Sequence, residues 1–130
     1  MKIPPIEYAM FCDYASVSMD GKFNLNGLFE RILLKDTPAR HPQMFVVTKL
    51  ILPEGKYNIT FTIMQEDEVL AKSNVEKESK GKLNAHTHFW GITNLEIKDL
   101  KPIELQILID GKQVFVKRLP VIKIEQKKKA

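Results

Sequence analysis

Residues 56–63 read Lys-Tyr-Asn-Ile-Thr-Phe-Thr-Ile, and this stretch decides the fold class. Large apolar side chains occupy the odd positions from 57 to 63, and Asn58, Thr60 and Thr62 occupy the even ones. Because residues two apart project from the same face of a strand, the pattern predicts a strand with one face in a core and one in water. Residues 45–52 are apolar on both parities, and Pro53-Glu54-Gly55 separates the two stretches. We therefore predict a hairpin that bends at residues 53–55.

Two Asp-Gly steps indicate further hairpins, because Asp-Gly accepts the positive φ that tight turns demand. Asp20-Gly21 lies between the predicted strands 8–17 and 22–29, and Asp110-Gly111 lies between 103–109 and 112–117. Gly27 interrupts its strand, which indicates a bulge or a close backbone approach. Residues 30–34 are expected to continue the strand 22–29 on a new axis. A polar turn is expected at 65–68 and a strand at 69–73, followed by a charged loop or frayed strand end at 76–82. The last expectations are a strand at 83–93 and either two helical turns or a loop at 94–101.

Eight or nine short strands without alternating helices predict an all-β fold. The expected architecture is an antiparallel two-sheet β-sandwich with an immunoglobulin-like or related topology. It forms a single domain over residues 1–130, with a short basic tail at about 125–130. The doubly apolar strand at 44–52 is expected either in the centre of a sheet or at a partner surface. An exposed strand edge would then give a route to a homo-oligomer.

Composition excludes several classes of protein. The chain has 130 residues, of which 44% are hydrophobic and 28% charged, with a net charge of +4. A single cysteine, Cys12, cannot form an internal disulfide, and the first residues carry no apolar core of a secretory signal, so a cytoplasmic protein is expected. No apolar run approaches the roughly 20 residues that span a bilayer. Lys127, Lys128 and Lys129 supply three of the four excess charges, so the nearly neutral body disfavours nucleic-acid binding.

Three turn and strand motifs carry a family resemblance. They are Asp13-x-Ala15, Gly21-Lys22-x-Asn24-Leu25-x-Gly27 and Ile109-Asp110-Gly111-Lys112. With these motifs the chain resembles an uncharacterised bacterial family of small, stand-alone β-sandwich proteins of unknown function. The resemblance implies a fold and no activity.

His86-Thr87-His88 is the candidate metal site, because residues two apart on a strand share a face and imidazole binds transition metals. The double-His pattern of barrel metalloenzymes needs a carboxylate four or five residues after the second His, where this chain has Ile92 and Thr93. A third ligand would have to come from elsewhere; the candidates are Glu96, His41 and Asp13. The alternative is a pair of surface or half-buried histidines.

Asp13, Phe89 and Trp90 are the candidate binding residues. A carboxylate between Phe11 and Ala15 needs hydrogen-bond donors, which backbone amides or Arg31 would supply, and the aromatic rings offer either a stacking groove or core packing. Cys12 is expected to pack as a small apolar side chain. The sequence therefore predicts a non-enzymatic interaction or ligand-binding module without a cofactor, whose partner is an unknown protein or small ligand. The alternative is a metal-dependent enzyme that uses His86 and His88.

Overall fold

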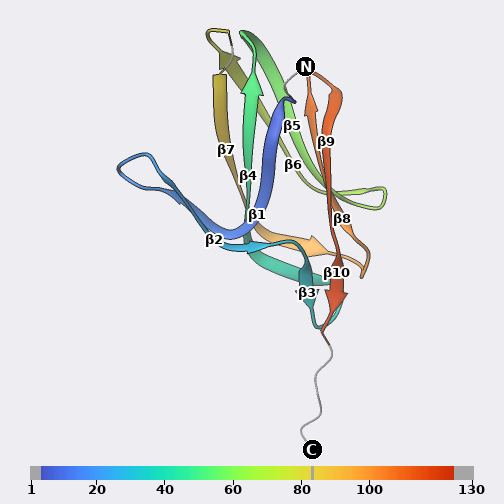
Figure 1. Cartoon of the computed structure of the whole chain (residues 1–130). Helices are drawn as coiled ribbons and strands as arrows, with labels where there is room; N and C mark the ends of the chain where they lie inside the picture. The colour runs from blue at the N-terminus through green and yellow to red at the C-terminus, as the bar shows by residue number, and fades with distance from the viewer. Residues whose placement is uncertain (1–3, 83, 125–130) are drawn as a thin grey trace, which may run out of the picture.

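The computed structural model describes residues 4–82 and 84–124, which form ten strands connected by turns and short loops (Figure 1). The predicted strand start at Leu83 and the basic tail lie outside the described residues. The strands are β1 (Ile6–Val17), β2 (Phe23–Phe29), β3 (Ile32–Leu34), β4 (Ala39–Leu52), β5 (Gly55–Gln65), β6 (Glu68–Ser79), β7 (Asn84–Ile97), β8 (Ile103–Ile109), β9 (Lys112–Leu119) and β10 (Val121–Lys123).

Two antiparallel four-stranded sheets pack face to face. Sheet I has the strand order β2-β1-β4-β7 and sheet II the order β6-β5-β8-β9. β3 and β10 form a short parallel pair. The prediction of an all-β, two-sheet sandwich is confirmed. The immunoglobulin constant domain has the orders A-B-E-D and C-F-G, and the strand orders of this sandwich differ from both.

The core lies between the sheets and follows the predicted alternation. Ile59, Phe61 and Ile63 on β5 are fully buried and face the apolar residues Val46 and Leu50 on β4. Burying such side chains removes apolar surface from water, and each large side chain contributes about 1.5–3 kcal/mol. The period-two pattern of residues 57–63 therefore predicted correctly which face of β5 lies in the core.

The hairpin predicted between 45–52 and 57–63 is wrong. β4 pairs with β1 and β7 in sheet I, whereas β5 pairs with β6 and β8 in sheet II. The bend after Leu52 carries the chain from one sheet to the other, and the Tyr57 hydroxyl donates a hydrogen bond to the Pro53 carbonyl across it (3.0 Å). A turn signal between two apolar runs fits a sheet-to-sheet connection as well as a hairpin.

The other predicted turns form hairpins as expected. Asp20-Gly21 connects β1 with β2, and Asp110-Gly111 connects β8 with β9. Asp110 and Gly111 have φ values of 51° and 82°, the left-handed conformation for which Asp-Gly is suited. The polar stretch at 65–68 turns β5 into β6, where Glu66 has a φ of 53°.

Two segments are strand where another conformation was considered. The 76–82 segment is β6 as far as Ser79, because its residues pair with β5 in a regular register. The two helical turns considered at 94–101 do not form. β7 continues through Ile97, which pairs with Ala39 of β4, and a loop follows before β8.

The end of the β1-β2 hairpin crosses the outer face of sheet I, the face that points away from sheet II (Figure 1). We call residues 13–28 the arm. Ala15 and Leu25 of the arm pack against Val47 of β4, together with Cys12. β4 is therefore covered on one face by sheet II and on the other by the arm. This explains why its sequence is apolar on both parities, and of the two alternatives for 44–52 the structure shows the strand in the centre of a sheet.

Candidate functional site

The two histidines of β7 face the interior of the sandwich. Register places His88 opposite Thr48 and His86 opposite Leu50 on β4, and directly opposed residues share a face of the sheet. The His88 ring stacks on Phe61 of sheet II, with 4.8 Å between ring centroids and 16° between ring planes. The pair is half-buried, as one of the sequence-based alternatives expected.

Burial changes the chemistry of the His88 imidazole. Burial lowers the pKa of His88 below its usual value, and the positive charge of Lys77 on β6 lowers it further. His86 Nε2 and Thr48 Oγ1 are buried without a hydrogen-bond partner among the described residues. A neutral imidazole is a metal ligand, so the His88 ring keeps that capability in its half-buried setting.

The structure brings no carboxylate to the histidine pair. Glu96 lies 3.7 Å from Arg40 in an exposed ion pair, and the His41 ring contacts Phe29 at 5.6 Å between centroids. Asp13 lies beside Gly27. Within residues 4–82 and 84–124, no three His, Cys, Asp or Glu side chains are grouped so that they could hold a metal ion.

Phe89, Trp90 and Asp13 do not converge on one surface. Trp90 faces the interior and contacts Phe61 at 6.1 Å between centroids, whereas Phe89 lies on the outer face against Phe23 of the arm at 5.3 Å. Asp13 is exposed on β1, and its Cγ lies 2.9 Å from the position a Gly27 Cβ would take. Gly27 has a φ of 69°, and a Cβ on it would meet the Asp13 side chain, so the close approach expected at Gly27 is to a side chain. The positive φ favours glycine there, and the Asp13 carboxylate occupies the space that a Cβ would take.

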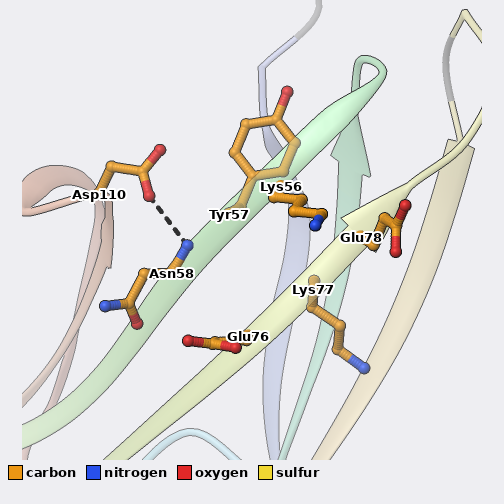
Figure 2. A pocket seen from close by; sticks show the side chains of 7 residues that line it. All are labelled: Lys56, Tyr57, Asn58, Glu76, Lys77, Glu78 and Asp110. Atoms are coloured by element: carbon orange, nitrogen blue, oxygen red, sulfur yellow. Dashed lines mark hydrogen bonds between the residues drawn. The ribbon is translucent and has the colours of Figure 1, made fainter.

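A polar cleft that sequence reasoning missed lies on sheet II where β5 and β6 extend past the β8-β9 turn (Figure 2). The Asp110 carboxylate accepts a hydrogen bond from the Asn58 backbone N–H (2.9 Å), and the Asp110 N–H donates to the Asn58 carbonyl (2.8 Å). The lining residues are Lys56, Tyr57, Asn58, Glu76, Lys77, Glu78 and Asp110. Opposite charges face each other across the two strands, since Lys56 of β5 lies opposite Glu78 of β6. The cleft therefore selects neither an anion nor a cation.

The free edges of the sandwich differ in how they are protected. Charged side chains, glycine irregularities and lysines that cap carbonyls discourage strand addition at an edge. β6 carries five charged residues and β9 carries three, while β2 is short and contains Gly27 at positive φ. β1 extends beyond the end of β2 and forms part of the same edge there. Lys117 of β9 protects this part of the edge by donating a hydrogen bond to the Ala9 carbonyl (3.0 Å).

β7 has none of these protections over residues 84–93, and Asn94 near its end has a φ of 53°. The strand is 14 residues long and contains no proline, and Glu96 is its single Asp, Glu, Lys or Arg. β4 pairs with one side of β7 from Asn84 to Ile97, and no strand among the described residues pairs with the other. Its backbone therefore presents unpaired N–H and C=O groups to a partner. Sequence reasoning missed this edge because charge content identifies an unprotected strand only after the sheet order shows which strands are edges.

A family model described as a family of unknown function (DUF6941) matches residues 7–122. The chain belongs to this family. The match includes all three motifs of the resemblance, which is confirmed as membership of an uncharacterised family. No curated protein matches the chain. Membership of DUF6941 assigns no activity, so a function has to be argued from the site. In the described part of this family member, no helix is long and apolar enough to span a membrane.

The lowered pKa of His88 predicts a stability that falls with acid. The folded state disfavours the charged ring, so protonation stabilises the unfolded chain, in which the pKa is about 6.5. His88 costs no stability above that pH, and the free energy of unfolding falls as pH drops below it toward the folded-state pKa.

Urea unfolding at pH 7.5 and pH 5.5, at fixed protein concentration, measures this loss. The His88→Phe variant, which keeps a ring against Phe61, should lose less stability over the same interval. Equal losses in wild type and His88→Phe would contradict the prediction.

Proposed function

We propose that the protein is a non-enzymatic interaction module that binds an extended polypeptide by strand addition at the free edge of β7. The observation that supports this is the contrast between edges. Residues 84–93 of β7 contain no charged residue and no positive φ, while the other edges carry charges, a positive-φ glycine or a lysine bonded to a carbonyl. We place the activity in the cytoplasm, for which the buried free thiol of Cys12 is suited.

Backbone pairing would supply the affinity at this edge, and side chains would supply selectivity. Alternate residues of β7 line the two faces beside an added strand. His86, His88 and Trp90 lie on the inner face, and Thr87 and Phe89 lie on the outer face. A bound strand would thus meet half-buried imidazole and indole rings on one side and the arm on the other. A partner with alternating apolar residues fits these surroundings best.

A strand-forming peptide tests this proposal. The probe is a peptide of alternating Thr and Val flanked by lysines, and its control carries N-methyl groups on alternate residues, which removes hydrogen-bond donors. We expect saturable shifts of the backbone amides of residues 84–92 in NMR titrations with the probe and none with the control. Ala85→Lys, at an exposed position on β7, should weaken binding about tenfold or more, because like charges oppose each other and a lysine disfavours edge pairing.

The matched control is Val69→Lys on β6, an exposed position on the edge of the other sheet. It adds the same charge at a different edge and should leave peptide binding unchanged. Shifts confined to β6 or β9, or equal binding of the N-methylated peptide, would contradict strand addition at β7.

A further inference from the structure

The arm exposes an unusual amount of apolar surface. Of the eleven large hydrophobic side chains that are exposed in the described part of the chain, five lie on the arm. They are Tyr14, Val17, Met19, Phe23 and Leu28. Met19 is fully exposed at the end of the arm. Clustered apolar surface on a small protein indicates an interaction site.

The arm is fixed in place rather than free. Phe23 packs on Phe89 of β7, and Tyr14 packs edge-on against Phe45 of β4, with 5.7 Å between ring centroids. Its end is ordered by a turn in which the Gly21 N–H donates to the Ser18 carbonyl (2.9 Å) and the Ser18 hydroxyl donates to the Asp20 carboxylate. A pre-organised surface loses little conformational entropy on binding.

The arm is also continuous with the free edge of β7. Because Phe23 contacts Phe89, the arm reaches β7 across the outer face of sheet I, and in Figure 1 its end lies beyond β7 on the side away from β4. A polypeptide paired with β7 in the plane of sheet I would therefore lie beside the arm.

We propose that the partner at β7 is a second copy of this chain, with the two β7 strands antiparallel and the arm of each copy against the other copy. This inference rests on the proposed function, because it uses the same strand edge. Antiparallel pairing of identical strands places a two-fold axis perpendicular to the sheet, which makes a closed, self-complementary interface. The outer faces of both copies then lie on the same side, so each arm extends toward its partner.

Charge and area both favour a second copy. Pairing centred within residues 84–92 brings no two charged residues of β7 into opposition, because this segment contains no Asp, Glu, Lys or Arg. A stable interface typically buries about 800 Å² per partner, and one row of paired backbone does not supply such an area by itself. The exposed Met19 and Val17 of the arm supply apolar area beside the paired strands.

Sedimentation velocity from micromolar to millimolar protein tests the dimer. We expect wild type to dimerise. Met19→Asp should raise the dimer dissociation constant about tenfold or more, because it places a charge at the apolar contact without touching the fold. Ala85→Lys should weaken the dimer at the strand edge. Val69→Asp makes a comparable change at an exposed apolar residue on β6 and should leave the dimer unchanged.

Peptide binding separates failure of the dimer from failure of the proposed function. Met19→Asp should bind the Thr-Val peptide at least as tightly as wild type, because it frees the β7 edge, whereas Ala85→Lys should weaken both the dimer and peptide binding. Wild type that stays monomeric at millimolar concentration overturns the inference while peptide binding stands. A Met19→Asp dimer as tight as wild type overturns the role of the arm. Loss of peptide binding in every protein, wild type included, overturns the proposed function itself.

Discussion

Replacing Gln65 with alanine is expected to lower the free energy of unfolding by about 3 kcal/mol, because the change leaves several backbone groups without partners. Gln65 ends β5 and is 4% exposed. Its Nε2 donates hydrogen bonds to the carbonyls of Asp99 and Lys101 (both 2.8 Å). Its Oε1 accepts from the N–H groups of Lys98 (3.0 Å) and Asp99 (3.1 Å). One amide thus satisfies four groups of the loop that carries the chain from sheet I to sheet II.

Urea unfolding at fixed protein concentration measures this loss, with Gln106→Ala as the matched control. The Gln106 amide donates one hydrogen bond to the Glu104 carboxylate (2.7 Å), and deleting it should cost about 1 kcal/mol or less. Gln65→Glu separates donors from acceptors, since a carboxylate still accepts from Lys98 and Asp99 but cannot donate to the two carbonyls. It should also be strongly destabilised. A Gln65→Ala protein as stable as Gln106→Ala would contradict the role of the four hydrogen bonds.

Gln65 also explains why the helical turns considered at 94–101 do not form. The window holds apolar residues at a spacing compatible with a short helix before Pro102. In the fold, β7 pairs with β4 as far as Ile97, and the next two N–H groups bond to Gln65 instead of to carbonyls within a helix. A short helix is marginal without tertiary contacts, so long-range hydrogen bonds decide this conformation, and local sequence does not report them.

Alternation predicted the core because it is a local property. Ile59, Phe61 and Ile63 are buried as their parity indicated. Sheet membership is not local. Pro53 marks a bend but not whether the next strand returns to the same sheet, so the predicted pairing of β4 with β5 failed. The double apolarity of β4 required knowledge of the arm, which covers a face that a simple two-sheet sandwich leaves open.

The same distinction between local and non-local properties applies to the candidate site. Residues two apart on a strand share a face, so the sequence predicted that His86 and His88 lie on one face of the sheet. They do so in the structure. Phe89 and Trp90 are consecutive and must point to opposite faces, which argues against a shared stacking surface. The unprotected edge of β7 became visible only with the sheet order, because the same residues in a central strand would expose no backbone.

Phe61→Ala should cost about 3–5 kcal/mol of unfolding free energy, the range for truncating a buried phenylalanine. Phe61 is fully buried in the middle of β5, and its ring contacts both His88 and Trp90 of the opposite sheet. Truncation therefore removes these two ring contacts between β7 and sheet II as well as leaving a cavity. Domains of this kind are stable by about 5–15 kcal/mol, so the variant should lose a large share of that margin.

Trp90 is the single tryptophan of the chain and reports the change directly. Urea unfolding followed by its fluorescence should give a much lower midpoint for Phe61→Ala, and the folded-state emission should shift to longer wavelength as water approaches the indole. Phe61→Leu keeps most of the volume and should cost less than Phe61→Ala. Val116→Ala, at an exposed position on β9, should change the midpoint little. If Phe61→Ala unfolded at the same urea concentration as Val116→Ala, Phe61 would not connect β7 to the core, and the half-buried setting of His88 would need another cause.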